Sequence, residues 1–334
     1  MPKGPSPENS VGITTTVPIE IIFAAGLVPV DLNNIFITDD DPSRLVEKAE
    51  STGLPRNNCA WIKGIFSAVQ KLNIKRIVGV IEGDCSNTHA LMEVLGAEGV
   101  DVTPFKYPYG RDRVLLQAQL NALADALGTD MDKAEAVKRE LERVRAYVHE
   151  VDRLTYQEAK VTGEENHIWN VSTSDIMGNV GLFEEKVKTF LVEAKNRVPM
   201  QHTVRLGYIG VPPICGGIYN FLEELGVHVV FNEIQRQFSM PYPTDNLVEQ
   251  YSRYTYPYDA RGRLEDIACE VKRRNIHGII HYVQSFCFRN IYDAVFRRGL
   301  DVPILTLECD RPGGVDGQMR TRIEAFVEML RKKE

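Results

Sequence analysis

"RIVGVIEGDCSNTHALMEVLGAEGV" is the sequence of residues 76–100, and it decides the fold class of this 334-residue chain. Its apolar run, Ile77–Ile81, is typical of a buried parallel strand, and the segment from His89 to Leu95 predicts the helix that follows. A predicted strand near residues 100–105 completes a βαβ unit, which indicates a parallel sheet covered by helices. Cys85 lies between the strand and the helix, at the end of a strand where α/β proteins bind their ligands.

The composition argues against several classes of partner. A net charge of −7 disfavours a general nucleic-acid binder, which is normally basic. The most apolar stretch, residues 17–32, contains a glutamate and two prolines, and it is too interrupted to cross a membrane. The first thirty residues lack the basic and apolar regions of a signal peptide. We therefore expect a cytoplasmic protein without nucleic-acid or membrane partners, whose six cysteines are not disulfides.

Strand and helix patterns alternate in two regions of the chain. We expect an α/β fold of two Rossmann/flavodoxin-like lobes with parallel sheets, at residues 1–130 and 199–334, joined by a helical connector at 131–198. One long amphipathic helix is predicted between about residues 114 and 160. Such a helix commonly packs on its own protein, and binding of a partner coil is the alternative. A second helical stretch is predicted at 175–196.

Further segments carry polar residues of interest. Residues 1–10 are expected to be a loose polar lead. The stretch 235–263 is rich in tyrosine and is expected to be a long irregular loop, which in a compact domain is usually functional. Glu20 is expected to be a helix carboxylate favoured by the dipole rather than a catalytic group. The sequence VSTSD at 171–175 is expected to cap the helix after it.

The cysteines form a pattern. Four of them follow predicted strands: Cys85, Cys215, Cys287 and Cys309. Cys59 begins a predicted helix, where backbone N–H groups and the dipole favour a thiolate. Cys269 lies inside a helix beside apolar residues and is expected to be a packing thiol. Each cysteine alone is compatible with a buried thiol that fills space, but strand ends that share one edge of a sheet indicate a metal centre.

The spacing of the cysteines bears on the kind of metal. Zinc is disfavoured because paired CxxC spacing is absent, whereas an iron–sulfur cluster is compatible with single thiolates from distant segments. A cysteine hydrolase that uses Cys85 and His89 is an alternative, although their spacing favours neighbouring positions on one helix turn. The sequence contains neither GxGxxG after a strand nor GxxxxGK[ST]. If the chemistry consumes ATP, we expect another protein to bind it.

Several motifs together resemble one family. They are GITTTVPIEIIFAAGLVPVDL, NNCAWIKG, EGDCSNTHALMEVL, HGIIHYVQSFC and LECDRPGGVDGQMRTRIEAFVEML. From about residue 11 to the C-terminus the chain resembles the 2-hydroxyacyl-CoA dehydratase and benzoyl-CoA reductase family, in its D-component. The resemblance implies an anaerobic enzyme with a [4Fe–4S] cluster held between α/β lobes by three cysteines, which match Cys59, Cys85 and Cys287. The fourth iron is left for water or for the thioester carbonyl of an acyl-CoA.

The same resemblance implies a reaction and its partners. An ATP-hydrolysing activator protein delivers one low-potential electron, and the dehydratases form a ketyl radical from which the hydroxyl group leaves. We expect an (R)-2-hydroxyacyl-CoA dehydratase-like lyase or an ATP-dependent reductase, working as a homodimer or with a related subunit. Arg111 and Arg113 are candidates for contacts with CoA phosphates, and Gln284 and Ser285 for hydrogen bonds to cluster sulfide or substrate.

The kind of metal centre stays open at this point. A related branch of the family carries a double-cubane [8Fe–9S] cluster on six cysteines and reduces small molecules. Cys215 falls near a position which that branch uses, and Cys309 or Cys215 is a candidate for a fourth ligand or a second centre. A non-catalytic iron–sulfur carrier is a further hypothesis, and so is a scaffold in which all six thiols only pack.

Overall fold

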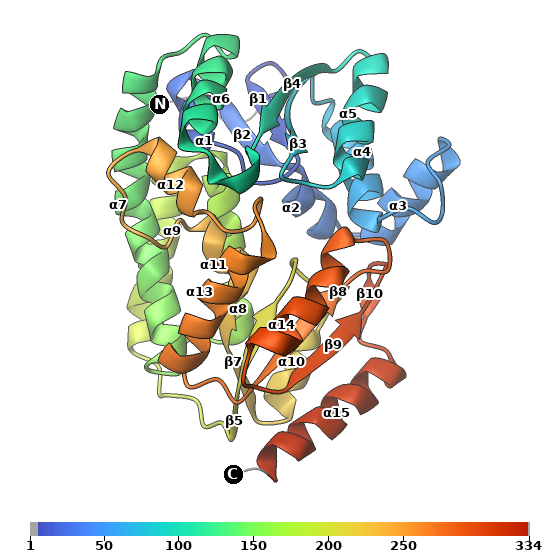
Figure 1. Cartoon of the computed structure of the whole chain (residues 1–334), viewed down its shortest axis with the longest axis vertical. Coiled ribbons are helices and arrows are strands. Elements are labelled where there is room, and N and C mark those ends of the chain that lie inside the picture. The colour runs from blue at the N-terminus through green and yellow to red at the C-terminus, as the bar shows by residue number, and fades with distance from the viewer. Residues whose placement is uncertain (1–5, 333–334) are drawn as a thin grey trace. The chain divides into compact units, whose positions relative to one another are not determined.

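The computed structural model describes residues 6–332, which divide into two units (Figure 1). Unit 1 contains the chain up to Ala146 together with Ser172–Lys186 and Phe238–Asp259. Unit 2 contains Tyr147–Val171, Val187–Gln237 and the chain from Ala260 onward. Each unit has its own four-stranded parallel sheet with helices around it, which confirms the predicted α/β class with parallel sheets.

The sheet of unit 1 has the strand order β2-β1-β3-β4. Its strands are β1 (Ser10–Ile13), β2 (Val28–Asp31), β3 (Arg76–Glu82) and β4 (Asp101–Lys106). All three pairings are parallel. The chain first adds β2 on one side of β1 and then adds β3 and β4 on the other side. The topological switch point, where doubly wound sheets bind their ligands, therefore lies between β1 and β3.

The sheet of unit 2 repeats this topology. Its strands are β5 (Val204–Ile209), β7 (Val227–Asn232), β8 (Gly278–Val283) and β9 (Ile304–Glu308), in the order β7-β5-β8-β9. All pairings are parallel, and every residue of β7 and β8 is buried, as expected of strands covered on both faces. The switch point lies between β5 and β8. A small separate sheet pairs β6 (Cys215–Gly216) with β10 (Gly313–Gly314).

Helices surround both sheets. Unit 1 contains α1 (Ile19–Ala24), α2 (Leu32–Ile37), α3 (Pro42–Ser51), α4 (Ala60–Leu72), α5 (Ser86–Ala97), α6 (Arg113–Ala126) and α12 (Leu247–Arg253). Unit 2 contains α8 (Gly163–Val171), α10 (Ile218–Glu224), α13 (Ala260–Arg273), α14 (Asp293–Gly299) and α15 (Gly317–Arg331). The ranges of α7 (Met131–Tyr156), α9 (Val180–Lys195) and α11 (Glu233–Phe238) include residues of both units. Among the helices of residues 6–332, none is long and apolar enough to span a membrane.

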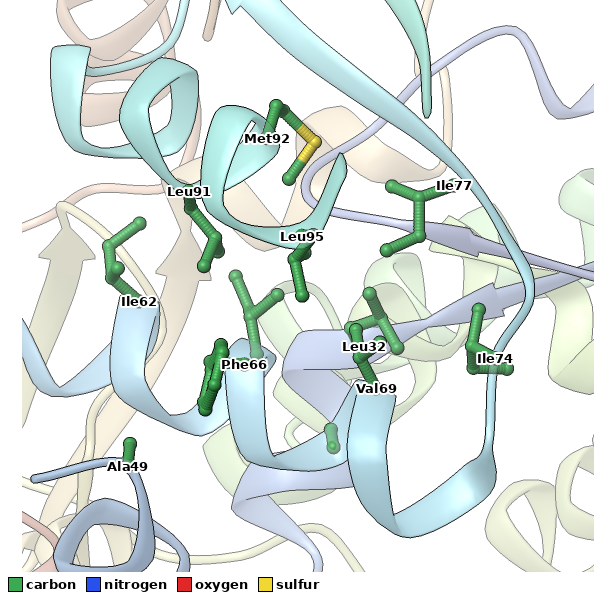
Figure 2. Close-up of a cluster of buried hydrophobic side chains, with 12 residues drawn as sticks. Leu32, Ala49, Ile62, Phe66, Val69, Ile74, Ile77, Leu91, Met92 and Leu95 are labelled. Carbon is green, nitrogen blue, oxygen red and sulfur yellow. The ribbon is translucent and has the colours of Figure 1, made fainter. Parts of the chain in front are cut away.

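The core beneath the Cys85 segment is an apolar contact between α4 and α5. Figure 2 shows Phe66 and Val69 of α4 and Leu91 and Leu95 of α5 in one buried cluster. Ile77 of β3 belongs to the same cluster, so the strand and both helices are packed together. The apolar positions of α4 recur every three to four residues, which produces the continuous buried face.

The helix predicted at 114–160 is in fact two helices. The helix α6 ends before Gly128, whose φ of 72° lies in the left-handed region that commonly ends helices. The helix α7 then begins at Met131. Leu141, Val144 and Val148 of α7 are fully buried, so its apolar face packs on its own protein as expected.

Two expectations about local structure are wrong. The stretch 235–263 is not a long irregular loop, because it contains α12 and parts of α11 and α13. Tyr251, Tyr254 and Tyr258 are buried there and gather around Tyr107. Of the polar lead predicted for residues 1–10, the first five lie outside the described residues, and the prediction is wrong at Ser10, where β1 already begins. Four residues are too few for a pattern to distinguish a strand from a loop.

Substitution of Gly64 tests the close packing of the α4 core. A Cβ atom at this position would lie 2.2 Å from Cγ of Phe36, so Gly64→Ala should overpack the core and lower the free energy of unfolding by about 1–3 kcal/mol. A Cβ atom at Gly96, in α5, would meet no other atom within 4 Å, and Gly96→Ala should be neutral or stabilising by about 0.5 kcal/mol. Denaturant unfolding of both variants provides the comparison. Equal stability of the two variants would contradict this packing.

Candidate functional site

Three cysteines occupy the same kind of position, directly before a helix. Cys59 is the N-cap of α4, Cys85 is the N-cap of α5, and Cys287 is the N-cap of the 3-10 helix η4 (Phe288–Tyr292). None of the three caps its helix with the side chain. The first backbone N–H groups of a helix favour negative charge nearby. Cys59 and Cys85 belong to unit 1, and Cys287 belongs to unit 2.

Cys59 and Cys85 share an apolar support. Both are partly buried and pack against the cluster formed by α4, α5 and β3. The sulfur of Cys85 lies 3.5 Å from Oγ1 of Thr88, and that hydroxyl lies 3.0 Å from Oδ2 of Asp84, to which it donates. Burial, together with the charge of Asp84, raises the pKa of the Cys85 thiol. A metal that binds Cys85 must therefore displace its proton.

The turn that carries Cys85 is fixed by a close contact. Gly83 follows β3 with a φ of 93°, and a Cβ atom there would lie 2.8 Å from Cβ of Tyr107 and 3.0 Å from Cβ of Pro257. Only glycine satisfies both the left-handed backbone and this lack of space. The hydroxyl of Tyr107 donates to the carbonyl of Thr16 at 2.9 Å, which anchors the contact to the segment after β1.

Arg111 lies beside the same aromatic cluster. Its guanidinium is 5.2 Å from the centre of the Tyr258 ring, a cation–π distance. Its Nε and Nη2 atoms are buried and have no hydrogen-bond partner among the described residues. Arg113, two residues further along, is exposed. Within the described residues, Arg111 therefore has two unsatisfied buried donor atoms, whereas Arg113 lies at the surface.

The loop that carries Cys287 is tied to the end of the neighbouring strand β9. The backbone N–H of Ser285 donates to Oδ1 of Asp310 at 2.8 Å, and its hydroxyl donates to Oδ2 at 2.6 Å. The N–H of Cys287 donates to the carbonyl of Gln284 at 3.0 Å, and Gln284 donates to the carbonyl of Cys309 at 3.4 Å. The sequence pattern does not indicate a role for Asp310, whose only signal is an acidic residue shortly after a predicted strand.

Cys215 and Cys309 lie together in unit 2. Each thiol is the other's nearest electrostatic neighbour, and the Cys309 thiol donates to the carbonyl of Arg311 at 3.3 Å. The neighbouring thiol is the largest cause of a pKa of about 7 for Cys309 and of a raised pKa for Cys215. Cys309 directly follows β9, as expected, whereas Cys215 belongs to the short strand β6.

Cys269 and His89 lie on exposed faces of their helices. The expectation that Cys269 is a packing thiol is wrong, because this residue is exposed. It is two residues from the buried Ile267, which on a helix places it about 200° around the axis, on the opposite face. His89 lies 3.7 Å from Glu93, while the sulfur of Cys85 contacts Thr88 instead. The geometry therefore offers no Cys85–His89 couple.

Glu20 is a structural residue. Its carboxylate is fully buried and accepts hydrogen bonds from Arg145 at 2.7 Å, Gln250 at 2.8 Å and the Tyr251 hydroxyl at 2.6 Å. Burial by itself would raise the pKa of Glu20, but the charge of Arg145 and these hydrogen bonds outweigh it and hold the pKa low. The carboxylate therefore stays charged and joins distant segments of unit 1.

Asp175, the last residue of the segment 171–175, forms a buried acidic pair with Asp31. Oδ2 of Asp175 accepts from the backbone N–H of Asp31 at 2.9 Å, and Oδ1 of Asp175 accepts from that of Met177 at 2.9 Å. Asp175 caps the 3-10 helix η3 (Ile176–Gly178), not α9 directly. Burial and the charge of Asp31 raise the pKa of Asp175 to about 7. The sequence does not predict this pair, because its two members are far apart along the chain.

No three His, Cys, Asp or Glu side chains gather as metal ligands within residues 6–332. None of the six cysteines forms a disulfide. A family model described as the 2-hydroxyglutaryl-CoA dehydratase D-component matches residues 14–330, nearly the whole chain. No curated protein matches the chain.

The acidic pair predicts a pH dependence of stability. Folded Asp175 keeps a proton up to a pH of about 7, whereas an unfolded aspartate loses it near its ordinary pKa of 3.8. Its contribution is therefore complete below about pH 4 and is lost as the pH rises towards 7. Asp31→Asn removes the neighbouring charge, so the loss of thermal stability between about pH 4 and 7 should be smaller than in the wild type.

The matched control is Asp41→Asn, at the N-cap of α3, which is exposed. This variant should retain the pH dependence of the wild type. Thermal unfolding across the pH range measures all three proteins. An unchanged slope in Asp31→Asn would show that the two carboxyl groups are not coupled.

Proposed function

Because the chain belongs to the 2-hydroxyglutaryl-CoA dehydratase D-component family, we propose that it dehydrates or reduces an acyl-CoA thioester by one-electron chemistry. The electron would come from an ATP-hydrolysing activator protein, since the chain has no ATP-binding loop motif of its own. The chain would act in an anaerobic cytoplasm, as a homodimer or with a related subunit. The match over residues 14–330 is the observation that carries this proposal.

The proposed cofactor is a [4Fe–4S] cluster held by Cys59, Cys85 and Cys287. The chemistry of the donors supports this proposal, because thiols are the soft ligands of iron–sulfur clusters and each of the three directly precedes a helix. When bound, such a cluster would carry a low-potential electron. One of its irons would have no protein ligand. The chain contributes the orientation of the thiols.

Unit 1 holds two of the proposed ligands by packing. Cys59 and Cys85 each directly precede a helix of the same apolar core, so the packing of α4 and α5 fixes the backbone positions that carry the two sulfurs. Gly83 and Tyr107 fix the turn before Cys85. Close-packed interiors resist shifts of their helices, and this support keeps the backbone of both cysteines in defined positions.

Unit 2 holds the third proposed ligand by hydrogen bonds. Asp310 receives both the N–H and the hydroxyl of Ser285, two residues before Cys287. Charge-assisted hydrogen bonds of this kind are stronger than neutral ones. We propose that Asp310 is a positioning residue for the Cys287 loop, and that Ser285 acts through this loop.

We propose that Arg111 binds an anionic group of the acyl-CoA. Its two buried nitrogen atoms without partners would donate to a phosphate or carboxylate oxygen. A guanidinium forms paired hydrogen bonds with such groups, and the Tyr258 ring beneath it restricts its orientation. Tyr258 directly follows Pro257, which lies against Gly83 in the turn before Cys85, so this short segment connects the surroundings of Arg111 and Cys85.

A double-cubane reductase is the alternative, and it would use six cysteines. The exposed position of Cys269 on α13 argues against it. The two candidates differ in iron content, because a double cubane holds about eight irons and a single cubane about four.

Cysteine substitution tests the proposed ligands. Anaerobically reconstituted wild type should contain about four iron and four sulfide ions per chain. Cys85→Ser should lose most of both, because a hydroxyl is a poor ligand for iron in such clusters. Cys59→Ser and Cys287→Ser should behave alike, and Cys269→Ser, a matched control on an exposed helix face, should retain the wild-type content. Full iron content in Cys85→Ser would refute the ligand assignment.

Arginine substitution tests the acyl-CoA site. Loss of a buried charge-assisted hydrogen bond costs about 1.5 kcal/mol or more, so Arg111→Gln should weaken binding of an acyl-CoA about tenfold or more. Arg113→Gln, at the exposed arginine, should change the Kd less than about twofold. Calorimetric titration of the cluster-loaded protein measures both. Equal affinities in the two variants would remove Arg111 from the site.

A further inference from the structure

Unit 2 contains a pair of thiols that the proposed reaction does not use. Cys215 and Cys309 are far apart in the sequence, yet their thiols are close enough to interact. They follow β5 and β9, which lie on either side of β8 in the sheet. The pair therefore results from the topology of the sheet and not from local sequence.

Two backbone contacts hold the segments of these cysteines together. The strand β6 pairs with β10, with Cys215 opposite Gly313, four residues after Cys309. The hydroxyl of Tyr282 donates to the carbonyl of Cys309 at 2.7 Å and accepts from the N–H of Ile214 at 3.3 Å. Tyr282 is buried and lies 6.2 Å, ring to ring, from Tyr208, so the bridging hydroxyl is held in place.

The two thiols differ in access to solvent. Cys215 is only 2% exposed, whereas Cys309 is half-buried and lines a cleft of about 330 Å³. The greater exposure of Cys309 makes it the accessible sulfur of the pair, and its neighbour Cys215 lowers the pKa of Cys309. An accessible thiolate beside a protected thiol is the arrangement in which one sulfur attacks and the other resolves.

The charge of this cleft indicates which small disulfide could reach Cys309. Acidic side chains line it, namely those of Glu308, Asp310 and Asp316, together with the cation Arg322. A cationic or uncharged small disulfide would enter more readily than an anionic one, because like charges repel.

We propose that Cys215 and Cys309 form a redox-active dithiol, which a low-molecular-weight disulfide oxidises reversibly. The Cys309 thiolate attacks one sulfur of the reagent RSSR and forms a mixed disulfide, and RS⁻ leaves. Cys215 then attacks the sulfur of Cys309, which forms the protein disulfide and releases a second RS⁻. The two protons of the protein thiols pass to the products, so two RSH form while two cysteines are oxidised. This proposal stands independently of the cluster.

Peptide mapping of the full chain tests the proposal. The reduced protein is treated anaerobically with cystamine, a cationic disulfide, and then alkylated and digested without reductant. Mass spectrometry should find a peptide that links Cys215 to Cys309, and dithiothreitol should remove the link. Cys269 is exposed, so it should carry cysteamine and report that the reagent was active.

Three variants complete the test. Cys215→Ser should leave Cys309 as a stable mixed disulfide, Cys309→Ser should leave Cys215 unmodified, and Cys269→Ser should form the link as the wild type does. Cysteamine that stays on Cys309 of the wild type, with Cys215 still a free thiol, would overturn the proposal. Loss of iron from the reconstituted Cys215→Ser or Cys309→Ser protein would also overturn it, because the two would then be cluster ligands.

Discussion

Parallel pairing of the strands is the constraint on which the rest of each unit depends. Parallel neighbours need a crossover connection, so every strand ends at the same edge of its sheet. In both units the chain adds strands first on one side and then on the other side of the first strand, which opens a switch point. Cys85 follows β3, beside the switch point of unit 1, and Cys215 and Cys287 follow β5 and β8, on the two sides of the switch point of unit 2. These thiols thus occur where the topology leaves room for a ligand.

Buried charged groups, through ion pairs and hydrogen bonds, join the separate chain segments of each unit. In unit 1, Glu20 binds Arg145 and Gln250, residues from the first and last of its three segments. In unit 2, Arg274 binds Asp152 at 2.6 Å, which links the end of α13 to α7. Removal of one partner from such a pair costs about 3–5 kcal/mol, because the other charge stays buried without compensation. The discontinuous units are therefore held together by polar contacts as well as by apolar packing.

Sequence patterns predict the features that depend on local periodicity. The strand at 76–82, the helices that begin after Cys59 and near Cys85, and the buried face of α7 all have clear apolar repeats. The patterns fail where contacts between distant segments determine the local structure. The strand β1 is too short to show a repeat, and the tyrosines of 235–263 are buried by packing on Tyr107. The contact between Cys215 and Cys309 and the role of Asp310 arise only when distant strands become neighbours.

Mössbauer spectroscopy of the ⁵⁷Fe-reconstituted protein, before and after addition of an acyl-CoA thioester, tests the central claim most directly. Three cysteine ligands leave one iron of a [4Fe–4S] cluster without a protein ligand. We expect about a quarter of the iron signal to change when the thioester binds, while the rest keeps the parameters of thiolate-bound iron. A spectrum that stays unchanged when the acyl-CoA is bound would contradict an open iron site and the reaction proposed for it.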